Sequence, residues 1–170
     1  MDYRRYLAET NKSGNAVLDD WRWLVGDQLQ LWHVTKAGDA LLRHSADGSI
    51  HFLDVKSGAV ERIADHEAAF EAAVGSASNA DRWLMSKVVD GQAALGMQPG
   101  ADQCLSFQHP PALGGAISPD NLELCGILVH FSIAGQIHRQ IKDLPPGTRI
   151  DELEIVPPGD GGRRPWWKFW

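Results

Sequence analysis

The chain has 170 residues, of which 44% are hydrophobic and 22% are charged, a balance that is ordinary for a soluble globular protein with a sizeable core. Its formal net charge is −6, but residues 163–170 carry three basic and no acidic side chains, so residues 1–162, with 13 basic and 22 acidic side chains, have a net charge of −9. This balance argues against nucleic-acid binding, because phosphate groups are bound by clustered Lys and Arg, and it favours a basic protein partner.

The sequence also points to a cytoplasmic protein. It contains no apolar run of about 18 residues, which predicts no transmembrane segment, and its first residues do not resemble a signal peptide. Its two cysteines, Cys104 and Cys125, are 21 positions apart and form no CxxC pattern. We expect reduced thiols rather than a disulfide bridge.

Residues 1–36 are predicted to form an N-terminal helical extension. Residues 2–12 have a weak helical pattern, which a Ser-Gly-Asn sequence then interrupts. From Val17 to Val25 the apolar residues recur at helical spacing, which predicts a short helix that ends at Gly26.

The segment from Leu29 to Ile63 has a different period. Its apolar runs are separated by Gly-containing turns, which predicts an antiparallel β-meander. The pair Asp47-Gly48 is the strongest hairpin signal, because both residue types tolerate the positive φ angles of a tight turn.

Two helices are predicted after the meander. Asp65 is the predicted N-cap of a helix over Glu67–Val74. A second helix is predicted from residue 78 or 79 to Leu95, with Gly91 weakening its middle.

Strand patterns return in the last third of the chain, over Cys104–Phe107 and Leu122–Phe131. A helix is then predicted, because isoleucines at positions 133, 137 and 141 are four residues apart and share one face. Two prolines and a glycine at 145–147 end this helix, and residues 151–156 are predicted to add an edge strand.

Strands and helices that are segregated along the chain predict an α+β fold, with helices packed on an antiparallel sheet, for a domain over residues 37–156. Residues 157–170 are predicted to be a flexible linker and a basic-aromatic tail. The tail contains Trp166, Trp167, Phe169 and Trp170, and three alternatives remain open for these rings. They dock on their own domain, contact a partner, or anchor the chain at a membrane interface.

Seven histidines raise the question of a metal site or a catalytic base. His130 and His138 lie eight positions apart, and His33, His44 and His51 fall on the meander. However, the sequence has no HxH, HExxH or CxxC motif, so we predict neither a metal nor another cofactor.

A nucleophilic site would need Cys104 or Cys125 to pair with His109 or His130. Both cysteines lie in apolar runs, where burial keeps a thiol protonated and unreactive. The two glycines at 114–115 lack the spacing and the lysine of a phosphate-binding loop. The sequence therefore predicts a protein that is not an enzyme.

Four stretches, GSIHFLDVKSGAVERIAD, NADRWLM, PPALGGAISPDNLEL and VHFSIAGQIHRQIKDLPPGT, resemble the C-terminal domain of type VI secretion immunity proteins, which was long a domain of unknown function. The resemblance runs from about Ala37 to Ile150. Its most specific positions are Pro111, Ala112, Leu113, Gly114, Gly115, Asn121, Gly135, Gln136, Ile137, His138, Lys142, Asp143, Leu144 and Pro145.

This resemblance implies a cytoplasmic bacterial immunity protein that binds and neutralises a cognate toxin, which is a DNA-degrading enzyme for the best-understood member. Such proteins can carry a GAD-like domain upstream, but only about 36 residues precede the resemblance here, too few for a second full domain. Either the toxin contact has moved or the chain has another task. One alternative is a regulatory or small-ligand-binding domain with a pocket between the sheet and the last helix, and another is a hydrolase that uses His and Asp.

If the partner is a basic nuclease toxin, acidic side chains are expected to form the contact. The sequence does not predict the oligomeric state. The candidate contact residues are Asp19, Asp20, Asp47, Glu67, Glu71 and Glu123.

Overall fold

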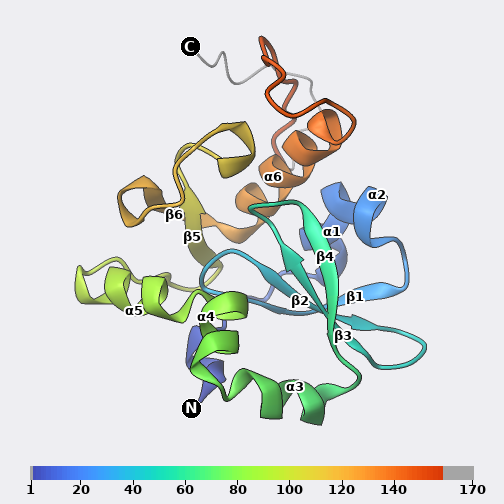
Figure 1. Cartoon of the computed structure of the whole chain (residues 1–170), viewed down its shortest axis with the longest axis vertical. Helices are drawn as coiled ribbons and strands as arrows, with labels where there is room; N and C mark the ends of the chain where they lie inside the picture. Colours follow the sequence, from blue (N-terminus) through green and yellow to red (C-terminus); the bar gives the residue numbers. More distant parts are fainter. Residues whose placement is uncertain (1, 159–170) are drawn as a thin grey trace.

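The computed structural model of the chain describes residues 2–158 and contains a four-stranded and a two-stranded antiparallel sheet together with helices (Figure 1). This arrangement confirms the predicted α+β class. In chain order the elements are η1 (Tyr3–Tyr6), α1 (Gly14–Leu18), η2 (Asp19–Trp21), α2 (Arg22–Val25), β1 (Leu29–Val34), β2 (Ala40–His44), β3 (Ile50–Asp54), β4 (Ala59–Ala64), α3 (Glu67–Val74), α4 (Ala77–Leu84), α5 (Ser86–Ala94), β5 (Gln103–Phe107), η3 (Pro111–Leu113), η4 (Pro119–Asn121), β6 (Leu122–Gly126) and α6 (Ile127–Ile141).

The central sheet is the predicted meander, with the strand order β1-β2-β3-β4 and every neighbouring pair antiparallel. Its β2–β3 turn contains Asp47 and Gly48, and Gly48 has a φ angle of 72°. The Asp47 carboxylate accepts hydrogen bonds from the backbone N–H and the hydroxyl of Ser49, at 2.9 and 2.6 Å. Because β1 belongs to this sheet, residues 1–36 contain a strand as well as short helices.

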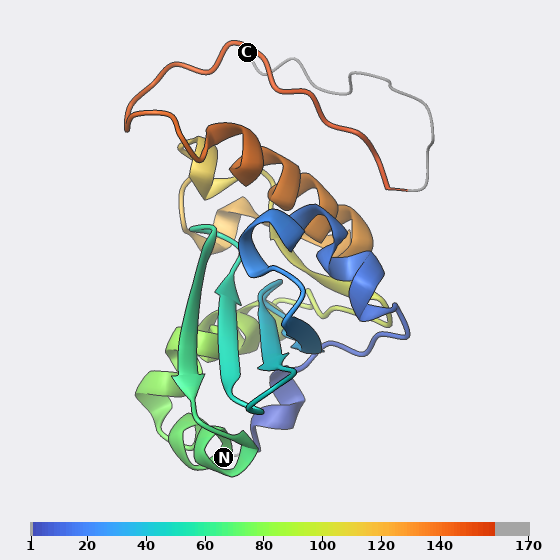
Figure 2. The same cartoon turned by 90° about the vertical axis from the view of Figure 1, so that its right-hand side faces the viewer.

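The middle strands of the central sheet, β2 and β3, have buried side chains on both faces, and each face has its own helices. Figure 2 shows the sheet between α3–α5 on one side and α6 with α1 and α2 on the other. Neighbouring residues of β2 point to opposite faces. Leu41 packs in the cluster that contains Phe70 of α3, whereas Leu42 packs in the cluster that contains Trp21 and Phe131.

The predicted helix over 17–25 is divided by a 3-10 turn into α1, η2 and α2. In a 3-10 helix, residues three positions apart eclipse each other. Leu18, the residue just before η2, and Trp21, its last residue, have this spacing and are both 0% exposed. The tight turn therefore directs both side chains into the core. The weak helical pattern predicted over residues 2–12 is helical only at Tyr3–Tyr6.

Helix α3 has the predicted bounds, but its predicted cap was wrong. The N-cap is His66, whose Nδ1 accepts a hydrogen bond from the backbone N–H of Ala69 at 3.2 Å. Asp65 instead forms an ion pair with Arg62 at 2.9 Å. The residue directly before the first helical turn holds the capping position, and here that residue is His66.

The single helix predicted from residue 78 or 79 to Leu95 is two helices, α4 and α5. They meet at Met85, which has a φ angle of 46° and ends α4 in the left-handed conformation. The break therefore lies at Met85, while Gly91 lies inside α5.

Strands β5 and β6 form the second sheet, but the prediction that a strand continues to Phe131 was wrong, because α6 begins at Ile127. The last residue of β6, Gly126, pairs with Gln103, the first residue of β5, so β6 ends where its partner strand does. Ile127 and Phe131 are four residues apart, and helical geometry places both in the core below the central sheet.

The predicted edge strand over residues 151–156 is not a strand. This segment runs beside α6, where the amides of Gln136 and Gln140 bond to the backbones of Val156 and Glu154. A helix uses its own backbone groups internally, so it offers side-chain amides rather than a strand edge to a neighbouring chain segment. The segment is nevertheless anchored, because Leu153 and Ile155 are 5% and 2% exposed.

No helix within residues 2–158 is both long and apolar enough to cross a membrane.

Candidate functional site

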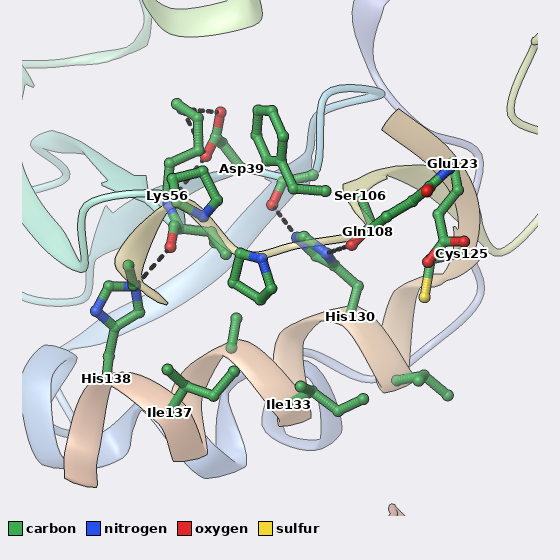
Figure 3. Close-up of a pocket in the computed structure, with 18 of the residues that line it drawn as sticks. Asp39, Lys56, Ser106, Gln108, Glu123, Cys125, His130, Ile133, Ile137 and His138 are labelled. Atoms are coloured by element: carbon green, nitrogen blue, oxygen red, sulfur yellow. Dashed lines mark hydrogen bonds and ion pairs between the residues drawn. The ribbon is translucent and has the colours of Figure 1, made fainter. Parts of the chain in front are cut away.

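A pocket of about 270 Å³ lies between the central sheet, α6 and the β5–β6 hairpin (Figure 3). Two turns of the central sheet, the loop after β5 and the segment beside α6 complete its wall. The lining residues are Ala37, Gly38, Asp39, Val55, Lys56, Ser106, Phe107, Gln108, Pro110, Pro111, Ala112, Glu123, Cys125, Val129, His130, Ile133, Ala134, Ile137, His138 and Ile155.

Helix α6 forms the floor of the pocket through two neighbouring rows of side chains. One row is apolar and consists of Val129, Ile133 and Ile137, and the other consists of His130, Ala134 and His138, each row spaced by four residues. The opposite side of the helix is held close to η2 at Gly135, where an added Cβ would lie 2.6 Å from the backbone oxygen of Asp20. Gly135 therefore allows the contact that fixes α6 in place.

His130 is a buried tie between three elements, as Figure 3 shows. Its Nε2 donates to the carbonyl of Gly38 at 2.7 Å, because a carbonyl oxygen only accepts, and its Nδ1 accepts from the hydroxyl of Ser106 at 2.9 Å. Burial lowers the pKa of His130 to about 4, against the opposing effect of the Gly38 carbonyl. His130 is thus neutral at pH 7, with both ring nitrogens engaged.

Gly38 is required for this contact for two reasons. Its φ angle is 87°, which L side chains rarely adopt, and an added Cβ would lie 2.7 Å from His130 Nε2 and 2.6 Å from the backbone oxygen of Leu105. The β1–β2 turn can therefore approach α6 only with glycine at this position.

The buried Asp39 and the partly buried Lys56 form an ion pair at the sheet side of the pocket. Lys56 Nζ lies 3.0 Å from Asp39 Oδ2 and 2.8 Å from Asp54 Oδ1, and the backbone N–H of Val55 donates to Asp39 Oδ1 at 2.9 Å. Burial raises the pKa of Asp39 to about 6, although Lys56 lowers it. Burial lowers the pKa of Lys56, but the two carboxylates raise it more, so its net shift is upward.

His138 makes a similar connection about two turns further along α6. Its Nε2 donates to the carbonyl of Val55 at 2.9 Å, and an added Cβ on Gly58 would lie 2.4 Å from its Nδ1. Burial lowers the pKa of His138, while the Val55 carbonyl opposes the shift. The two histidines therefore join α6 to the β1–β2 and β3–β4 turns.

The histidines and cysteines do not form the catalytic arrangements that the sequence raised. Cys104 and Cys125 are free, lie directly opposite each other in the β5–β6 register, and have pKa values that burial raises. His109 bonds through Nε2 to the carbonyl of Leu113, and both nitrogens of His130 are engaged elsewhere. Within residues 2–158 no three His, Cys, Asp or Glu side chains are grouped so as to hold a metal ion.

The first group of residues that carry the family resemblance shapes the loop at the pocket rim. Asn121 holds this loop through three hydrogen bonds, to the backbone N–H and carbonyl of His109 and to the carbonyl of Ala116, at 2.9, 2.8 and 2.8 Å. Gly114 has a φ angle of 91°, and an added Cβ on Gly115 would lie 1.9 Å from the oxygen of His109. The other three members also lie at this rim, in η3: Pro111, Ala112 and Leu113.

The second group lies on and after α6. Gln136 bonds to Asp20, Ser132 and Val156, and so joins η2, α6 and the following segment. Gly135, Ile137 and His138 have the packing roles described above. The remaining four lie just beyond the helix, where Lys142 pairs with Asp143, Leu144 is 44% exposed, and Pro145 accepts a hydrogen bond from Thr148.

The six acidic candidates do not form one patch. Asp19 and Asp20 lie on η2, Glu67 and Glu71 on α3, Asp47 in the β2–β3 turn, and Glu123 on β6 at the pocket.

Four of these candidates are engaged within the chain. Glu67 pairs with Arg43, Glu71 with Arg4, and Asp47 with Arg62. Asp20 accepts hydrogen bonds from Ser132 and Gln136. No cation within residues 2–158 pairs with Asp19 or Glu123.

The predicted tail residues Trp166, Trp167, Phe169 and Trp170 lie outside the described part of the chain. Sequence reasoning missed Gly38, Asp39 and Lys56 as site residues. A usable signal existed, because the hairpin register of the predicted meander pairs Ala40 with Leu53 and so brings Asp39 beside the β3–β4 turn.

Comparisons with known proteins agree with the sequence resemblance. Residues 64–138 match the family model described as "T6SS immunity protein Tdi1, C-terminal", where T6SS is the type VI secretion system. The match confirms the resemblance over a shorter range than the expected 37–150. It includes α3 to α5, the larger part of α6 and most of the pocket wall. No curated protein matches the chain with significance.

A solved structure with a similar fold is the crystal structure of Atu4351 from Agrobacterium tumefaciens. The TM-score is 0.51 at 16% sequence identity, over 80% of this chain and 65% of that chain. The chain thus spans less than two thirds of the length of that protein, and at this identity the likeness shows the fold alone.

Proposed function

We propose that this protein binds and neutralises a cognate toxin, and that the toxin is a nuclease, because residues 64–138 match the model of the C-terminal family of type VI secretion immunity proteins. The family match is the observation that carries the proposal. Neutralisation by binding requires a complementary surface on the immunity protein rather than a reaction on it.

The charge of the chain supports a basic partner. A nuclease needs a positive surface to hold the phosphate backbone of its nucleic-acid substrate. Residues 1–162 of this chain have a net charge of −9. Opposite charges raise the rate of encounter between two proteins and favour the correct orientation. A basic nuclease toxin is therefore a suitable electrostatic partner for this acidic body.

Among the six acidic candidates, Asp19 and Glu123 are best placed to meet a cation of the partner. An acidic side chain that already pairs with an arginine of its own chain, such as Glu67 with Arg43, must exchange that partner before it binds another. Glu123 is exposed at the mouth of the pocket, next to apolar surface of α6. It combines an available charge with a neighbouring depression, the features of a contact centre with a charged rim.

The proposal is tested by co-expression with a candidate type VI secretion toxin, sought first among the genes next to this one. Cells that produce the toxin alone should lose their DNA and stop growing, and the full chain should restore growth and co-purify with the toxin. Restoration without a complex, or a complex without restoration, would contradict neutralisation by binding. A toxin that stops growth when produced alone but leaves DNA and RNA intact, and that the chain neutralises, would reject only the nuclease assignment.

A second candidate function is suggested by the pocket. A regulatory domain that binds a small apolar molecule would use a depression of this kind between the sheet and α6. A thermal-shift screen of small apolar compounds tests this candidate, and stabilisation that Ala112→Phe abolishes would favour it over toxin binding.

A further inference from the structure

The pocket presents apolar surface that the described chain does not cover. Val129, on its outer edge, is 41% exposed, and Ile133, Pro111 and Ala112 continue the apolar wall inward. Its volume of about 270 Å³ lies just below the usual range for small-ligand sites and suits one or two large side chains.

The chain itself leads from this pocket toward a suitable occupant. Ile155 lines the pocket and is 2% exposed, and the described chain continues only to Pro158. Trp166 follows Ile155 by eleven residues, which span up to about 36–40 Å when extended. Helix α6, the longest wall, has 15 residues and is about 22 Å long, so residues 163–170 can reach any part of the pocket.

The chemistry of residues 163–170 matches the pocket in two ways. Four of the last five residues are aromatic, and each such ring can bury about 150–250 Å² on an apolar surface. The segment also carries Arg163, Arg164 and Lys168, while Glu123 at the mouth of the pocket has no cation partner within residues 2–158. The pocket thus offers apolar contact and a charge of the opposite sign.

We propose that residues 163–170 bind in the pocket of their own chain, with Trp166 or Trp167 seated between α6 and η3 and a basic side chain beside Glu123. This inference does not depend on the proposed function. The occupant closes the apolar mouth, and any partner that uses this mouth must first displace it.

The tether makes such binding effective even if the segment binds weakly by itself. A short linker gives an effective concentration of about 1 mM, so a segment that binds as a free peptide with a Kd of about 0.1 mM is docked in about nine-tenths of the molecules.

The test uses the full chain with 5-fluorotryptophan and a water-soluble paramagnetic agent, which broadens the fluorine lines of exposed tryptophans. Trp→Phe substitutions at 166, 167 and 170 assign the lines of the segment. At least one of these lines should broaden about tenfold less in the full chain than in a synthetic peptide of residues 159–170, as expected for nine-tenths docking.

Two variants then locate the docking site. Ala112→Phe fills the pocket, Glu123→Lys reverses the charge at its mouth, and both should return the protected line toward its broadening in the free peptide. Asp27→Lys, an exposed acidic site on the loop between α2 and β1, makes the same charge change elsewhere and should leave the protection intact. Unchanged lines of the buried Trp21 and Trp83 show that each variant is folded.

Three outcomes would overturn the proposal. The lines of the segment broaden in the full chain as they do in the peptide, or the protection survives in both pocket variants. In the third, protection appears only with anionic vesicles or rises with protein concentration, which would indicate a membrane or the pocket of a second copy.

Discussion

The two faces of the central sheet differ in what fills them. On the side of α3–α5, Phe70 is 0% exposed and its ring lies 5.4 Å from that of Tyr3, 5.6 Å from that of Trp32 and 5.8 Å from that of Trp83. On the side of α6, buried His130, His138 and Asp39 join the elements through hydrogen bonds and an ion pair, and a pocket remains.

This difference separates stability from binding. Aromatic rings in contact fill space and resist any loss of volume. Hydrogen bonds and ion pairs between buried polar side chains fix elements at a few points and leave a depression between them. These buried groups must remain paired, because an unpaired polar group in the interior is costly. We therefore expect core substitutions on the α3–α5 side to act mainly on stability, and those on the α6 side to act also on pH response, loop order and binding.

The largest effect on stability is expected from Phe70→Ala, on the α3–α5 side of the central sheet. Removing a fully buried ring from an aromatic cluster should lower the free energy of unfolding by about 4 kcal/mol. Urea unfolding followed by circular dichroism measures the loss. A loss below about 1 kcal/mol would show that the cluster can collapse onto the space and that the two sides are not packed differently.

The second prediction concerns the pH response of the α6 side. The folded-state pKa of His130, about 4, lies below the ordinary value of 6.5, so between these values the unfolded chain binds a proton that the folded chain does not. The contribution of His130 to stability is therefore present above pH 6.5 and is lost as the pH falls to about 4, by about 3 kcal/mol in total.

The variant His130→Gln isolates this contribution. It should be less stable than the unsubstituted protein at pH 7, and the difference should shrink by about 3 kcal/mol between pH 6.5 and 4. Asp39 has the opposite sign, because its raised pKa of about 6 adds stability as the pH falls, but it is present in both proteins and cancels from the difference. A constant difference across this pH range would contradict a neutral, buried His130.

A smaller effect is expected at the pocket rim. Asn121→Ala removes three hydrogen bonds to the loop and should lower the free energy of unfolding by about 2 kcal/mol. Hydrogen exchange of the loop amides at 109–121 should increase more than exchange in α3. Asn121→Asp keeps the acceptor and loses the two donor bonds, so its effect should lie between those of the native residue and alanine.

The smallest effect on stability, and a selective effect on binding, is expected from Glu123→Lys. Reversing the charge of this exposed side chain should lower the association rate with a basic partner several-fold and weaken the dependence of that rate on salt. Glu67→Lys, on the α3–α5 side, makes the same charge reversal and should lower the association rate less. Equal effects in stopped-flow measurements would mean that net charge, and not the α6 side, guides the encounter.

The local pattern of the sequence was enough to predict the meander, α3 and the α+β class. Strand and helix periods, together with turn pairs such as Asp47-Gly48, depend on near neighbours in the chain, so they are visible without the fold. The resemblance to the immunity family was also carried by short stretches, and the match over residues 64–138 confirms it.

Tertiary structure decided the ends of elements and the pocket. Ile127–Phe131 suits a strand or a helix equally by composition. It is helical because β5, the partner strand of β6, begins at Gln103, opposite Gly126, and so offers Ile127–Phe131 no further strand to pair with. Residues 151–156 have a strand-like pattern, but their neighbour is a helix and only its side-chain amides are available to them. The pocket depends on contacts such as that of His130 with Gly38, 92 residues apart in the chain, and a sequence pattern does not determine contacts at such separations.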